Sequence, residues 1–269
     1  MASSKKTSRK KTKVITYLLQ DDEETHVNKL KSKEYWFQVR EPLTCLAFLA
    51  PLLLCYELGV WQYGGTTPNA IRNAADCWMR NGLGKLGAGP IWVLPLLLMA
   101  ILLVWHVVGR YRWEVSGETL VGMFAESLLF AFVLVGIAMG QEHFLNQAIS
   151  TNSLSVSNGI LHHSITFIGA GIYEEVLFRL LLLPVLYGVF RLLQLNKPWA
   201  ACLSILATSL LFSLAHYVGA NGDEFIATVF LFRFLAGAAF SALFIFRGFG
   251  ITVGCHAAYD IIVGVLLVT

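Results

Sequence analysis

Two adjacent glutamates, Glu174 and Glu175, interrupt an apolar stretch that runs from about residue 165 to residue 190. A stretch of this length can cross a bilayer as a helix, and each charged carboxylate near its middle costs roughly 2.5–3.5 kcal/mol on insertion scales. Arg179 follows Glu175 by four residues, which is the favourable order for an ion pair on one helix face. Glu174 lies about 100° further round the helix. We therefore expect Glu175 to pair with Arg179 and Glu174 to be the free, reactive carboxylate.

Two histidines occur in later apolar stretches. His216 ends the run that begins at Phe212, and His256 stands four residues before Asp260, so that these two share one helix face. A single histidine in an apolar helix is most simply a hydrogen-bonded packing residue. A glutamate, a histidine and a His–Asp pair on three separate stretches instead favour a general-base or metal-binding site. Since buried polar groups need common solvation or a common ligand, we expect Glu174, His216 and His256 to converge on one cavity.

The composition is that of a helical membrane protein. The 269 residues are 56% hydrophobic and 14% charged, whereas soluble domains average about 25% charged residues. Half of the lysines and arginines lie in the first 41 residues, so the net charge of +3 gives no reason to expect nucleic-acid binding. The five cysteines include no Cys-x-x-Cys pair and predict neither a disulfide framework nor a cysteine metal site.

Seven apolar segments meet the requirement of about 20 residues for a transmembrane helix. They lie at about 43–62, 90–109, 119–139, 162–190, 199–218, 225–246 and 249–268. The chain is therefore predicted to be an all-α, polytopic transmembrane bundle of about seven to eight spans. We expect a polar, basic cytoplasmic tail at 1–41 and a transmembrane domain at 42–269. Within the segment at 162–190, Gly169 and Gly171 would let a neighbouring helix approach closely, and Pro184 is expected to bend or end it.

The distribution of lysine and arginine predicts a cytoplasmic N-terminus in the plasma membrane. With that orientation the outer loops at 140–160 and 219–224 carry no Lys or Arg, and the inner loops carry Arg110, Arg112, Arg191, Lys197 and Arg247. We expect no signal peptide, because the first apolar span follows a long polar leader. The outer loop at 63–89 is the exception, because it contains Arg72, Arg80 and Lys85. Its apolar residues recur at helical spacing, which predicts an amphipathic helix on the outer surface.

Other charges inside the predicted spans are expected to be structural. Arg233 lies in the middle of a span, and its candidate partners are Glu126 and Asp260. Glu57 stands near the end of the first span and is expected to reach the membrane interface. These residues therefore give no independent reason to predict a second reactive site.

Three short patterns, taken together, resemble those of a known family. They are Glu174-Glu-x-x-x-Arg179, Phe212-x-x-x-His216 and His256-x-x-x-Asp260. In order and spacing they are similar to the motifs of the CAAX-protease and bacteriocin-processing (CPBP, or Abi) intramembrane proteases. The last motif of this family ends in Asn or Asp. The resemblance covers about residues 160–264, and residues 1–140 match only as a helical membrane protein.

The resemblance implies hydrolysis of a peptide bond within or near the membrane. Glu174 would be the general base that activates water with help from His216, and His256 and Asp260 would face the oxyanion of the tetrahedral intermediate. The chemistry of these residues agrees, because removal from water makes a carboxylate a stronger base and a buried imidazole can donate to an oxyanion. The resemblance gives a supporting role, holding the helix and its charge balance, to Glu175 and Arg179.

Asp260 fits its implied role poorly, since an ionised aspartate only accepts hydrogen bonds. It could orient His256 instead, or bind a metal. The family has been described both as metalloproteases and as metal-free glutamic proteases. We expect metal-free water activation. One divalent ion, zinc, remains the alternative, with the ligand set Glu174, His216, His256 and Asp260.

Two other functions stay open. One is a non-catalytic immunity or scaffold protein of the same fold, although a scaffold has no reason to keep costly polar groups in the membrane. The other is a proton-coupled transporter, although transporters usually show repeated halves and this sequence shows none. The expected partners are a membrane protein or peptide substrate and the lipid bilayer. A CAAX-type protein, a sorting-signal protein and a leader peptide all remain possible substrates.

Overall fold

The computed structural model describes residues 34–64, 71–89, 91–145, 159–219 and 222–267, with the side chains of 142–145 outside this description. Most of the predicted tail at 1–41 therefore falls outside it. Residues 34–38 are helical and belong to a unit of their own, Met1–Gln38. The remaining description concerns the second unit, Val39–Thr269.

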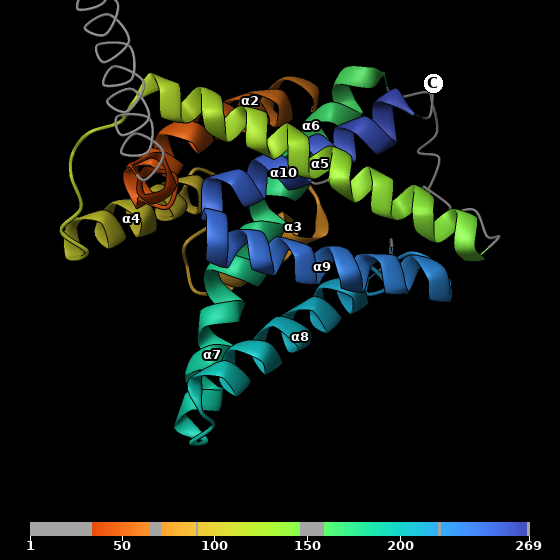
Figure 1. Cartoon of the computed structure of the whole chain (residues 1–269). Coiled ribbons are helices and arrows are strands. Elements are labelled where there is room, and N and C mark those ends of the chain that lie inside the picture. The colour runs from red at the N-terminus through yellow and green to blue at the C-terminus, as the bar shows by residue number, and fades with distance from the viewer. Residues whose placement is uncertain (1–33, 65–70, 90, 146–158, 220–221, 268–269) are drawn as a thin grey trace, which may run out of the picture. The chain divides into compact units, whose positions relative to one another are not determined.

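The described part of this unit is helical and contains no strand, which confirms the predicted all-α class (Figure 1). Its elements are α2 (Pro42–Tyr63), α3 (Ala74–Lys85), α4 (Val93–Val108), α5 (Gly117–Leu145), α6 (Ile160–Glu175), the π-helical η2 (Val176–Leu182), α7 (Leu183–Leu192), α8 (Lys197–Ala215), α9 (Ala227–Arg247), α10 (Phe249–Ile261) and the π-helical η3 (Ile262–Leu266). Every predicted span coincides with one of these helices or with a run of them. In the described residues, α2, α5, α8, α9 and the run from α10 to η3 are long and apolar enough to cross a membrane, and α4 is a shorter apolar helix.

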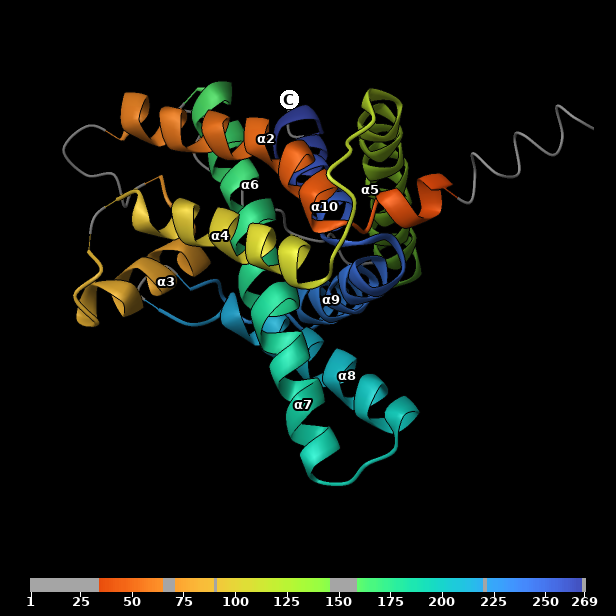
Figure 2. The same cartoon turned by 90° about the vertical axis from the view of Figure 1, so that its left-hand side faces the viewer.

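The segment that carries the two glutamates is one continuous column of three elements. Figure 2 shows α6 running into α7, with the π-helical η2 between them. Proline has no N–H to donate to the preceding turn, and the helix type changes just before Pro184. The column does not end at Pro184, because α7 continues to Leu192. Single π-helical turns often occur at functional sites, and this one begins directly after Glu175.

Helix α10 lies at the centre and packs on both α5 and α6. The predicted close approach at the two α6 glycines is present. A Cβ at Gly171 would lie 2.7 Å from the backbone nitrogen of Ala257, and a Cβ at Gly169 would lie 2.1 Å from the ring of Tyr56. The absence of a side chain at Gly171 thus lets α6 approach α10, and its absence at Gly169 lets α6 approach Tyr56 of α2.

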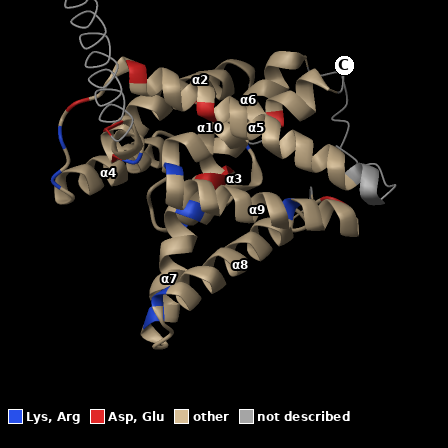
Figure 3. Ribbon diagram, in the orientation of Figure 1, with Lys and Arg blue, Asp and Glu red and all other residues tan. Residues whose placement is uncertain are grey.

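Charged residues are sparse on the long helices and gather around α3 (Figure 3). Asp76 accepts hydrogen bonds from Arg72 at 2.7 Å and from Arg80 at 2.6 Å, and Glu57 accepts from the same two arginines at 3.3 and 2.6 Å. The Asp76 side chain is 0% exposed and that of Glu57 is 4% exposed. These four residues, named here the α3 cluster, tie α3 to α2.

The α3 cluster corrects two expectations. Glu57 does not reach the interface but accepts buried ion pairs from Arg72 and Arg80. The helix at 74–85 forms as expected, yet it is anchored by buried charges rather than resting on the surface by its apolar face alone. The two arginines that break the charge rule in loop 63–89 are thus neutralised inside the protein, so they carry little weight in predicting orientation.

The predicted partners of Arg233 are wrong. Arg233 pairs with Asp223 at 2.5 Å, and Glu126 instead binds Arg247 through two contacts of 2.5 and 2.8 Å. Asp223 lies just before α9 begins at Ala227, so the Arg233 side chain reaches back along its own helix. A long arginine side chain can reach a partner beyond its own turn, which sequence spacing alone does not show.

Candidate active site

Glu175 and Arg179 form the predicted ion pair. Arg179 Nη1 donates to Glu175 Oε1 at 2.9 Å, and both side chains are 0% exposed. Arg179 Nη2 also donates to the carbonyl of Gly237 on α9 at 3.0 Å, and its guanidinium lies 4.4 Å from the ring centre of Phe212. The arginine therefore links the glutamate helix to α8 and α9, which carry other parts of the site.

His256 is held from both sides. Its Nδ1 lies 2.7 Å from Glu175 Oε1, and its ring stacks on Phe240 with centroids 4.5 Å apart. Its Nε2 lies 3.5 Å from Asp260 Oδ2, one turn further along α10. Because Nδ1 faces Glu175, the other ring nitrogen is directed at Asp260 and at Glu174.

Glu174 stands apart from the buried pair. Its Oε1 accepts a hydrogen bond of 3.4 Å from Asn73 Nδ2. Its Oε2 is buried and makes no hydrogen bond with any described residue. That oxygen lies 4.0 Å from His216 Nε2 and 3.9 Å from His256 Nε2. The structure thus places one oxygen of Glu174 within 4.0 Å of two imidazole nitrogens.

His216 follows the last residue of α8 and is fixed by its own helix. Its Nδ1 lies 2.8 Å from the carbonyl of Phe212, which leaves Nε2 facing Glu174. With Nδ1 facing that carbonyl, a neutral imidazole presents Nε2 as an acceptor that can take a proton or orient water.

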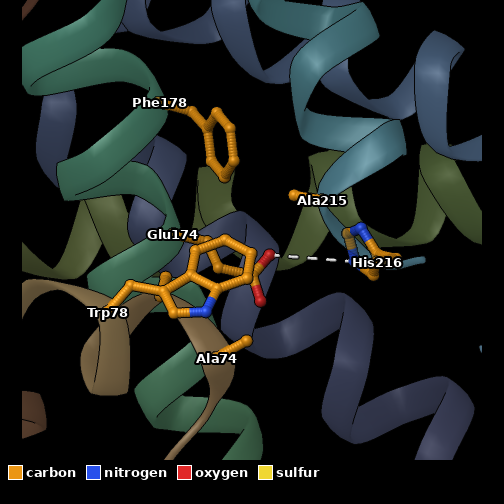
Figure 4. Close-up of a pocket in the computed structure, with 7 residues that line it drawn as sticks. Ala74, Trp78, Glu174, Phe178, Ala215 and His216 are labelled. Carbon is orange, nitrogen blue, oxygen red and sulfur yellow. Dashed lines mark ion pairs between the residues drawn. The ribbon is translucent and has the colours of Figure 1, made fainter. Parts of the chain in front are cut away.

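A pocket opens beside this group of side chains. Figure 4 shows Glu174 and His216 facing one another with Trp78 beside them. Its lining residues come from α3, from the glutamate segment and from the end of α8, and they are Ala74, Ala75, Trp78, Glu174, Phe178, Ala215 and His216. The wall is apolar apart from the glutamate and the histidine, so a bound chain would lose water as it reached them.

The distances from Glu174 to the two histidines are longer than those in a formed zinc site. With bonds of about 2.0–2.1 Å, two ligands of a tetrahedral zinc ion lie about 3.3 Å apart. Glu174 Oε2 is 3.9 and 4.0 Å from the two histidine nitrogens, farther apart than this, whereas Asp260 Oδ2 lies 3.5 Å from His256 Nε2, close to the separation of two zinc ligands. Across the described ranges, no group of three or more His, Cys, Asp or Glu residues could hold a metal ion as placed.

Sequence reasoning missed Asn73 and the pocket wall contributed by α3. Asn73 lies in a polar loop with no recognisable pattern, and it reaches Glu174 only because the α3 cluster fixes the start of α3. A weak signal was present. An asparagine just before a helix with an aspartate three residues later is typical of an N-cap, and Asn73 Oδ1 does accept from the backbone N–H of Asp76 at 2.8 Å.

The fold and this geometry define a class: a multi-pass, all-α membrane protein with a carboxylate and two histidines at one pocket. Residues 156–262 match the family model described as type II CAAX prenyl endopeptidase Rce1-like, which confirms the predicted resemblance to the CAAX-protease family. The matched segment contains all six predicted site residues but not α3. No curated protein and no solved structure matches the chain.

Proposed function

We propose that this chain is an intramembrane endopeptidase in which Glu174 activates the water that attacks the peptide bond. One observation carries the proposal. Glu174 Oε2 makes no hydrogen bond with a described residue, yet it faces the Nε2 atoms of His216 and His256 at 4.0 and 3.9 Å. A water about 2.8 Å from each of two atoms can bridge them across 4 Å. A carboxylate kept ready for such a water is what general-base hydrolysis requires.

Glu174 can carry out both proton transfers that the hydrolysis needs. Glu174 takes a proton from the water while the resulting hydroxide attacks the peptide carbonyl carbon. The C–N bond then breaks, and the protonated Glu174 returns its proton to the leaving amine. The neutral His216 accepts a hydrogen bond from the water and so orients it. All of this takes place at the wall of a mostly apolar pocket, where each polar contact is stronger than in bulk water.

The remaining site residues support this chemistry. His256 is the candidate donor to the oxyanion. Glu175 fixes its Nδ1, and its Nε2 is left 3.9 Å from Glu174 Oε2. Asp260 lies 3.5 Å from the same Nε2 and stabilises the imidazolium that such a donor needs. We therefore assign to Asp260 the orientation of His256 and not direct contact with the oxyanion. Glu175 and Arg179 hold the two helices together.

The proposed substrate is a membrane-associated protein with a prenylated CAAX terminus, as the description of the matched family indicates. The apolar pocket wall that contains Trp78 and Phe178 suits a lipid-modified or hydrophobic chain. We further propose a cytoplasmic N-terminus, on the charge distribution of the inner loops, and the plasma membrane as the location, on the basic N-terminal tail.

The test uses purified protein in liposomes with three peptides: one prenylated CAAX peptide, its unprenylated twin and one leader peptide. Mass spectrometry of the products should show cleavage of the prenylated peptide by the wild type and none by Glu174→Gln. Cleavage of only the leader peptide would contradict the proposed substrate. Proton uptake by the liposomes without any cleavage would support a transporter instead.

Metal dependence is a second arm of the same experiment. We propose that chelator-treated protein keeps its proteolytic activity, since Glu174 Oε2 lies 3.9 and 4.0 Å from the two histidine nitrogens, farther than two ligands of one zinc ion. Elemental analysis should accompany the assay. Stoichiometric zinc, with activity lost on its removal and restored on its return, would contradict metal-free water activation.

A further inference from the structure

Asn73 lies outside the matched segment and just before α3, yet its side chain reaches the candidate base. The amide oxygen accepts from the backbone N–H of Asp76 at 2.8 Å and so caps α3. The amide nitrogen donates to Glu174 Oε1 and to the carbonyl of Gly169, both at 3.4 Å. One side chain thus joins the first turn of α3 to the glutamate helix at two points.

Buried hydrogen bonds to α2 and between charged side chains fix the start of α3. Asp76, on the first turn of α3, accepts from Arg72 and Arg80 and also from the hydroxyl of Tyr56 on α2 at 2.7 Å. Glu57 accepts from the hydroxyl of Tyr173 at 2.7 Å, and Tyr173 directly precedes Glu174. The α3 cluster therefore ties α2, α3 and α6 together beside the candidate base. Asn73 is consequently fixed in space before it meets Glu174.

The two oxygens of Glu174 have different surroundings as a result. Oε1 receives the Asn73 amide, whereas Oε2 faces His216 and His256. A carboxylate with no such tether rotates freely about its terminal torsion, which is broad for glutamate. We infer that Asn73 is a positioning residue that holds Glu174 by Oε1 and so presents Oε2 to the water. This inference rests on the proposed function, since it assigns Glu174 the role of base.

Three variants separate positioning from helix capping. Asn73→Ser keeps a good N-cap but is too short to reach Glu174, and Asn73→Ala removes both contacts. Asn73→Asp keeps the cap and places a second carboxylate where the amide nitrogen stood. The matched control is Asn196→Ala. Asn196 caps α8 in the same way, by accepting from the backbone N–H of Trp199 at 3.0 Å, and it is exposed and outside the site.

We expect Asn73→Ser to lower kcat roughly 10–100-fold with little change in KM, because a misplaced catalytic group costs rate rather than binding. Asn73→Asp should also move the acidic limb of the pH profile to higher pH, because the new negative charge favours protonation of Glu174. The other titratable groups that face Glu174, namely His216, His256 and Asp260, stay unchanged in this variant. Asn196→Ala should keep its rate within about twofold.

A thermal unfolding midpoint is measured for every variant, so that Asn73→Ser still tests the idea if Asn73→Ala does not fold. A wild-type kcat and pH profile for Asn73→Ser would overturn the inference, as would equal losses in Asn73→Ser and Asn196→Ala. Glu174→Gln, measured in parallel, keeps two failures apart. If Glu174→Gln stays active, the proposed function fails. If it is inactive while Asn73→Ser behaves as wild type, only the role of Asn73 fails.

Discussion

Glu175→Gln should destabilise the protein far more than the same change at its neighbour Glu174. Glu175 Oε1 accepts from Arg179 at 2.9 Å and from His256 at 2.7 Å, with the glutamate and the arginine both 0% exposed. Removing one charge of a buried pair costs about 3–5 kcal/mol, because the other charge stays buried without its partner. The glutamine oxygen still accepts hydrogen bonds, so we expect the lower end, about 3 kcal/mol.

Glu174→Gln is the matched control, since it replaces one carboxylate oxygen of the adjacent glutamate with the same amide group. From the described residues Glu174 accepts one hydrogen bond, of 3.4 Å, and its side chain is 14% exposed, so its loss should cost about 1 kcal/mol or less. Unfolding of the purified proteins in one detergent gives the comparison.

A double-mutant cycle compares Glu175→Gln and Arg179→Met with the variant that carries both changes. Arg179→Met added to Glu175→Gln removes the unpaired buried cation, so the double variant should recover at least about 1 kcal/mol over Glu175→Gln alone. Equal, small losses from Glu174→Gln and Glu175→Gln would refute the division of roles. A double variant that loses the full sum of the two single changes would refute the ion-pair explanation.

Two further predictions concern packing and buried charge. Gly171→Val should lose stability and activity, because a Cβ there lies 2.7 Å from Ala257 N and overpacking costs about 1–3 kcal/mol. Gly188→Val is the control, since a Cβ at Gly188 meets no atom within 4 Å. In unfolding and cleavage assays it should keep the stability and activity of the wild type. Asp76→Asn should lower the unfolding free energy by about 3 kcal/mol, and a loss under about 1 kcal/mol would contradict the buried α3 cluster.

The helices and the Glu175–Arg179 pair could be predicted because both depend on local sequence. Apolar runs of span length fix where the helices lie, and the i, i+4 spacing of Glu175 and Arg179 fixes their pairing. The convergence of His216 and His256 on Glu174 was expected from the cost of isolated polar groups in a membrane. Their exact contacts, including the one between His256 and Glu175, depend on how α10 packs on α6.

The α3 cluster could not be predicted for a physical reason. Glu57 meets Arg72 and Arg80 only after α3 folds back on α2, and these residues are 15 and 23 positions apart with no periodicity that links them. A loop with three basic residues therefore looks exposed until its buried acidic partners are known. The same holds for Arg233, whose partner Asp223 lies before its helix, and for Asn73, whose reach to Glu174 depends on the position of α3.

The most direct test of the central claim is the cleavage rate of folded Glu174→Gln on the prenylated CAAX peptide. General-base catalysis contributes roughly 10²–10⁴-fold to a rate, so this variant should lose at least about 100-fold in kcat while its unfolding midpoint stays near that of the wild type. A folded Glu174→Gln that cleaves within tenfold of the wild-type rate would contradict the assignment of Glu174 as the base that activates water.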